Sequence, residues 1–111
     1  GSDMVIQPGG DSGGGTVGTS ATSAAAIPAL ANGANPKWVY IAITLDSGVS
    51  ITLTFGGSGV ATPTLIAGIG LSAHGGGIIV NVAGCSHWRA ISTDADTTIT
   101  ITPLAGISTR A

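Results

Sequence analysis

The chain has 111 residues, of which 43% are hydrophobic and 7% are charged, and its formal net charge is −2. This length suffices for one domain but excludes two independently stable cores. The basic residues Lys37, Arg89 and Arg110 are scattered, which excludes nucleic acid as a partner because phosphate binding needs clustered Lys and Arg. No apolar run long enough to span a membrane and no leader pattern occurs, so we expect no membrane partner and synthesis in the cytoplasm.

The first 26 residues are predicted to be a flexible arm. Residues 1–3 look like a cloning remnant before a start at Met4. Residues 7–26 are rich in Gly, Ser, Thr and Ala and carry almost no large side chains, so they bury too little apolar surface to offset the entropy of ordering. The part from 16 to 27 could still add a strand to an exposed sheet edge. We therefore expect a remnant and arm over 1–26 and a β-sandwich domain over 27–111.

From Pro36 onward, apolar residues alternate with period two, which predicts half-buried strands. The predicted strands cover residues 38–43, 50–55, 61–66, 78–82, 87–92 and 97–102. A Gly-rich loop is expected over 68–77. Six short strands, or seven with the arm, predict an all-β fold, namely a single antiparallel β-sandwich that is jelly-roll-like.

Residues 42–55 match residues 90–103 without gaps, with six of 14 positions identical. Each copy has the pattern of a strand, a turn headed by Asp46 or Asp94, and a second strand. Asp favours such turns because its carboxylate accepts backbone N–H bonds two residues on. The match predicts two hairpins. It is equally explained by an internal repeat and by convergence in a chain rich in Thr and Ile.

Nucleophilic catalysis has weak support. Cys85 is the only cysteine, so no intramolecular disulfide is possible, and its turn context predicts a small half-buried residue. His74 begins a His-Gly-Gly-Gly run of the kind found in esterase oxyanion holes, but no Gly-x-Ser-x-Gly elbow accompanies it. His87 follows Cys85 by two residues, and on an extended strand their side chains lie about 6 to 7 Å apart, too far for a nucleophile and its base.

Acid–base and metal chemistry are equally unsupported by the sequence. The chain has no Glu, and Asp94 and Asp96 lack the further oxygen ligands of a calcium loop. No Gly-Lys pair of a phosphate-binding loop occurs. The sequence therefore predicts a non-enzymatic protein with no catalytic residue, no metal site and no cofactor.

Four residues are candidates for an interface, namely Trp38, Tyr40, Trp88 and Arg89, because Trp, Tyr and Arg are enriched at interface hot spots. Trp88 and Arg89 are adjacent on one predicted strand, so they should point to opposite faces. The alternative is that Trp38 and Trp88 are core or rim residues of the sandwich.

The second half of the chain resembles small bacteriophage virion proteins. The likeness is carried by PKWVYI at 36–41, VAGCSHWRAI at 82–91 and ITITPL at 99–104, after an arm of small residues. The resemblance implies location in the virion and a structural role, with capsid decoration or stabilisation first and a head-to-tail or tail component second. It implies other virion proteins as partners, such as the major capsid protein, and no catalytic residue.

Low charge and open sheet edges favour association of the chain with itself. We expect a homo-oligomer, with a trimer first and a dimer second. A different reading is a carbohydrate-binding or adhesive module, which requires Trp38, Tyr40 and Trp88 to line one open face. A small hydrolase around His74 or His87 is disfavoured by the missing carboxylates.

Overall fold

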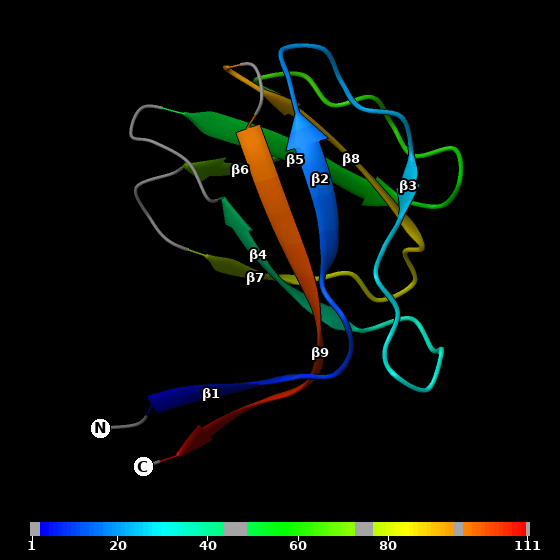
Figure 1. The fold of residues 1–111 in the computed structure, drawn as a ribbon, viewed down its shortest axis with the longest axis vertical. Coiled ribbons are helices and arrows are strands. Elements are labelled where there is room, and N and C mark those ends of the chain that lie inside the picture. Colours follow the sequence, from blue (N-terminus) through cyan, green and yellow to red (C-terminus); the bar gives the residue numbers. More distant parts are fainter. Residues whose placement is uncertain (1–2, 44–48, 73–76, 95–96, 111) are drawn as a thin grey trace.

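The computed structural model describes residues 3–43, 49–72, 77–94 and 97–110, and these residues form strands, turns and loops without a helix (Figure 1). The strands are β1 (Asp3–Pro8), β2 (Gly13–Val17), β3 (Ala25–Ala26), β4 (Trp38–Ile43), β5 (Ser50–Gly56), β6 (Ile69–Ser72), β7 (Ile78–Asn81), β8 (His87–Ser92) and β9 (Thr97–Arg110).

The strands form two sheets in which all the pairings are antiparallel. The first sheet has the order β1-β9-β4-β7, with β2 also paired to β9, and the second has the order β3-β8-β5-β6. The long β9 accommodates two partners on one side, because β2 pairs with its first five residues and β1 with its last part. β1 and the end of β9 form a two-stranded ribbon that extends away from the sheets, with both chain ends at its tip (Figure 1).

Apart from β1, the strand orders are 2-9-4-7 and 3-8-5-6. Successive strands change sheet at every step from β2 to β9 except between β5 and β6, which are paired neighbours. This arrangement is that of a jelly roll, an eight-stranded double sheet. The predicted antiparallel, jelly-roll-like β-sandwich is confirmed.

The core lies between the two sheets and follows from the alternation of the strands. The inward-facing rows are Val39, Ile41 and Ile43 on β4 and Trp88, Ala90 and Ser92 on β8. Ile51 and Leu53 of β5 and Ile99 and Ile101 of β9 complete the centre of this cluster. β4 and β8 bury one side chain in two, as the sequence period predicts. In β5, Thr52 is buried as well as its neighbours Ile51 and Leu53.

The N-terminal segment differs from the predicted arm, because β2 and β3 are strands of the two sheets. Val17 at the end of β2 is fully buried in the core. Gly14 has φ +133°, and a Cβ there would collide with the carbonyl oxygen of Ile99. The glycines of this segment had suggested an unfolded arm. In the structure, their lack of a side chain lets the backbone of β2 approach β9 closely. The sandwich therefore begins before residue 27.

Two further local predictions are wrong. The strand expected over 61–66 is absent, and β6 instead lies in the expected Gly-rich loop, paired with β5. The two hairpins are also absent, because β4 and β5 belong to different sheets, as do β8 and β9. Alternation shows which side of a strand is buried but not which strand is its neighbour. The turn expected at Asp46 lies outside the described residues.

Candidate functional site

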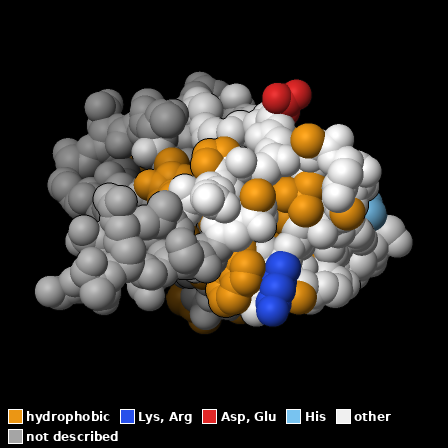
Figure 2. Space-filling model, turned by 90° about the horizontal axis from the view of Figure 1, so that it is seen from below, with side chains coloured by type: hydrophobic (Ala, Val, Ile, Leu, Met, Phe, Trp, Pro, Cys, Tyr) orange, Lys and Arg blue, Asp and Glu red, His pale blue; other side chains and the backbone are white. Residues whose placement is uncertain are grey.

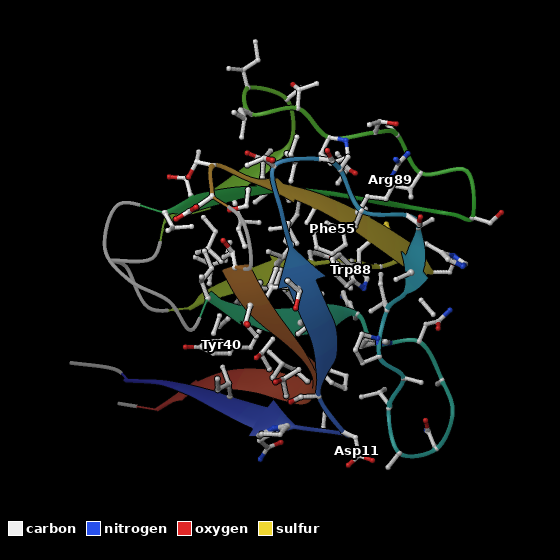
Figure 3. The ribbon with its side chains drawn as sticks, turned by 45° about the horizontal axis from the view of Figure 1, so that its top comes forward. Asp11, Tyr40, Phe55, Trp88 and Arg89 are labelled. Carbon is white, nitrogen blue, oxygen red and sulfur yellow. The ribbon has the colours of Figure 1, made fainter. Side chains whose placement is uncertain are left out.

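Trp88 and Arg89 point to opposite faces of β8, as predicted from their adjacency. Trp88 is 4% exposed and belongs to the core between the sheets, where it lies opposite Phe55 of the neighbouring strand (Figure 3). Arg89 is half-buried on the outer side of the second sheet. Of this pair, only Arg89 is on the surface.

The Arg89 side chain is held by two loops. Its Nε donates to the Thr22 carbonyl oxygen at 2.8 Å, and its Nη1 donates to Thr62 Oγ1 at 2.6 Å. The first loop is also fixed to β8, because Thr22 N donates to the Ala90 carbonyl and Ala90 N donates to Thr22 Oγ1. The Arg89 side chain of β8 therefore links the loop around Thr22 and the loop around Thr62 to the second sheet. We refer to Arg89 with these two hydrogen bonds as the clamp.

The segment from Gly57 to Gly68 covers part of the outer face of the second sheet. Thr54 Oγ1 donates to the Ala61 carbonyl oxygen at 2.6 Å, and Thr52 is only 6% exposed although it points away from the core. A Cβ on Gly68 would contact the Thr52 side chain at 2.7 Å. The outer face of the second sheet is consequently not an open platform.

This covering segment ends in a small turn that presents aliphatic side chains to solvent. Thr64 and Ala67 are joined by two backbone hydrogen bonds of 3.3 and 3.2 Å, which leaves Leu65 and Ile66 between them. Leu65 is 53% exposed and Ile66 is 98% exposed, and Ile69 at the start of β6 is 39% exposed. We refer to Leu65 and Ile66 as the apolar tip.

The apolar tip was not predicted, because the sequence pattern assigned residues 61–66 to a strand. The available signal was Pro63, since a proline inside an apolar run argues against a strand. The exposure of Ile66 depends on how the covering segment crosses the sheet, which no local pattern encodes.

Trp38 and Tyr40 lie on the outer face of the first sheet, two residues apart on β4, and both are half-buried. The Tyr40 ring packs across the backbone of Gly77, where a Cβ would collide with it. Trp88 faces the core from the other sheet. The three rings therefore do not line one face.

The residues weighed for catalysis lie near the start of β8. His87 Nδ1 is 2.7 Å from Ser86 Oγ, and Cys85 is half-buried. His74 and Asp96 lie outside the described residues. In the described parts of the chain, no three His, Cys, Asp or Glu side chains gather closely enough to hold a metal ion. Nor does any described segment form a helix long and apolar enough to cross a membrane.

Comparisons with known proteins return no match to a protein family, to a curated protein or to a solved structure. The surfaces described above and the sequence resemblance to phage virion proteins are therefore the basis for a functional proposal.

Proposed function

We propose that the protein is a non-enzymatic structural protein of a bacteriophage virion, which decorates or stabilises the capsid through homo-oligomeric contacts of its β-sandwich. The observation that carries the proposal is the coincidence of open strand edges with exposed aliphatic side chains. The jelly roll is compatible with this role, since viral capsid proteins use it, although lectins do so too.

Each sheet has an edge strand without charged residues at one of its two edges. β7 ends the first sheet and β6 ends the second, and neither contains Asp, Glu, Lys or Arg. Proteins that remain monomeric usually protect such edges with charges, prolines or bulges, because unpaired N–H and C=O groups invite another strand. Unprotected edges favour association.

The rest of the surface is also weakly charged. On the face shown in Figure 2, few charged side chains interrupt the hydrophobic and uncharged polar ones. With a net charge of −2, self-repulsion between copies is small. This property suits a protein packed closely against copies of itself and a shell.

The carbohydrate-binding alternative required three aromatic rings on one open face, and Trp88 lies in the core instead. Location in the head-to-tail region or the tail remains the second form of the virion proposal. Both forms need the same kind of contact surface. They are distinguished by whether the chain is found with phage heads or with phage tails, which the second test measures.

The first test is the solution mass of the full chain, measured by light scattering over a dilution series. We expect a trimer or a dimer that persists on dilution. A monomer up to high micromolar concentration would contradict the homo-oligomeric part of the proposal.

The second test concerns the virion. Phage particles from the bacterial host that produces the chain are banded on a density gradient, separated into heads and tails, and analysed by peptide mass spectrometry. Peptides of the chain should band with heads at a copy number comparable to that of the capsid protein. Peptides found only with tails would support the second form, and their absence from particles would refute the virion role.

A further inference from the structure

We propose that the clamp couples the local opening of two segments of the chain, so that release of one from the second sheet loosens the other. The first is residues 18–27, which we call the edge segment. The second is the covering segment, residues 57–68, which carries the apolar tip. This inference goes beyond the proposed function, because it concerns how a single copy of the chain opens.

The edge segment runs along one side of β8. Ser92 N donates to the Gly18 carbonyl oxygen, and Thr22 N donates to the Ala90 carbonyl oxygen, both at 2.8 Å. Thr22 Oγ1 in turn accepts from Ala90 N at 3.0 Å. Further along, β3 pairs with the start of β8. The edge segment therefore takes the place of a neighbouring strand over the length of β8, although only β3 within it is regular.

The edge segment is weakly anchored to the core. Within residues 18–27, Ile27 alone is buried, and the rest of the segment is held mainly by hydrogen bonds at the sheet edge. The covering segment has two buried anchors, Val60 and Pro63. Segments with few buried apolar contacts open locally at a lower free energy than the core. We therefore expect the edge segment to leave β8 before the sandwich unfolds.

The clamp is the link between the two segments, because both of its hydrogen bonds come from one guanidinium group. Arg89 lies between the segments (Figure 3), with Nε bonded to the Thr22 carbonyl oxygen and Nη1 bonded to Thr62 Oγ1. A planar guanidinium that is held at one nitrogen is already oriented for the second bond, so each bond reduces the entropy lost in forming the other. When the edge segment opens, Nε loses its acceptor and the bond to Thr62 weakens.

The coupling acts in both directions, because a free energy that links two local equilibria is reciprocal. Whatever immobilises the covering segment therefore also holds the edge segment on β8. A molecule that binds Leu65 and Ile66 would slow the opening of the edge segment. In this way a contact at the apolar tip would alter the stability of the N-terminal part of the second sheet.

The test is amide hydrogen exchange of the full chain, followed by NMR at the amides of Thr22 and Ser92, whose hydrogen bonds join the edge segment to β8. Thr62→Val removes one acceptor of the clamp and should speed exchange at both amides by about 2- to 5-fold, the effect of losing one exposed hydrogen bond. Thr62 is exposed, so the variant should fold normally, as far-UV circular dichroism will check.

Thr54→Val is the matched control. It removes the hydrogen bond from Thr54 Oγ1 to the Ala61 carbonyl oxygen, which also attaches the covering segment, but it leaves the clamp intact. It should therefore leave exchange at Thr22 and Ser92 unchanged. In an Arg89→Met background, Thr62→Val should likewise have no effect on these two amides.

Three outcomes would overturn the coupling. The first is unchanged exchange at Thr22 and Ser92 in Thr62→Val. The second is equal acceleration in Thr62→Val and Thr54→Val, which would mean that any loosening of the covering segment suffices without the clamp. The third is exchange of both amides in the unmodified chain at the rate of the β4 amides, which report global unfolding. None of these outcomes depends on whether copies of the chain associate.

Discussion

Replacing Arg89 by Met tests whether this residue is a clamp within the chain. Met keeps much of the apolar stem and removes the guanidinium, so the change isolates the hydrogen bonds to Thr22 and Thr62. A hydrogen bond to a charged group contributes about 1.5–3 kcal/mol, and we take the low end for the half-buried Thr22 bond and less for the exposed Thr62 bond. The expected loss is about 2 kcal/mol, which for a domain of this size lowers the melting temperature by about 10 °C.

The assay is a double-mutant cycle measured by urea unfolding. Thr62→Val removes one acceptor and should cost about 0.5–1 kcal/mol when Arg89 is present and almost nothing in the Arg89→Met background. The difference between these two costs is the coupling energy of the pair. Segment 57–68 should also exchange its amide hydrogens faster in both single variants, because one of its attachments to the second sheet is lost.

Two results would refute the clamp. One is a loss below about 0.5 kcal/mol in Arg89→Met, within the range of ordinary surface substitutions. The other is an equal cost of Thr62→Val in both backgrounds. If Arg89→Met instead left the stability of the folded chain unchanged and weakened its self-association, Arg89 would be an interface residue, as the sequence suggested.

Two other predictions concern the Tyr40 ring and the N-terminal strands. Gly77→Ala places a methyl group against the Tyr40 ring and should destabilise the fold by about 1–3 kcal/mol through overpacking; Gly59→Ala, where a Cβ meets open space, is the control, and equal thermal unfolding of the two variants would contradict the packing. Deleting residues 4–8 removes only β1 and should change stability little, whereas deleting residues 4–17 also removes β2 with its buried valine and should cost about 3 kcal/mol or more in urea unfolding. Equal stability of both truncations would mean that the segment behaves as the predicted arm.

The sequence predicted the positions of four strands closely. Residues 38–43 and 87–92 coincide with β4 and β8, and 50–55 and 78–82 agree with β5 and β7 to within one residue at one end. In residues 38–43 and 50–55, large apolar residues recur at period two, so the local pattern is sufficient there. Trp88 and Arg89 were placed on opposite faces by the same reasoning, and the structure agrees.

Strands that depend on their partners could not be predicted. β2 is largely glycine, and it is a strand because β9 supplies an edge that glycine can approach closely. The last strand was predicted over residues 97–102 only. In the structure β9 continues to Arg110, with the Pro103 carbonyl accepting from Gly9 N at 2.8 Å. The apolar tip was missed for the same reason, since its exposure depends on tertiary packing.

The structure also distinguishes the two explanations of the internal match. The gapless alignment equates the second strands well, because Ile51 and Ile99 are both buried. The first strands disagree, since Ala42 is half-buried on an outer face and its counterpart Ala90 is fully buried in the core. A one-residue shift reverses the faces of a strand, so a structural repeat would need a gap that the sequence match lacks. The match is therefore better explained by convergence on the Thr and Ile alternation that one-sided strands require.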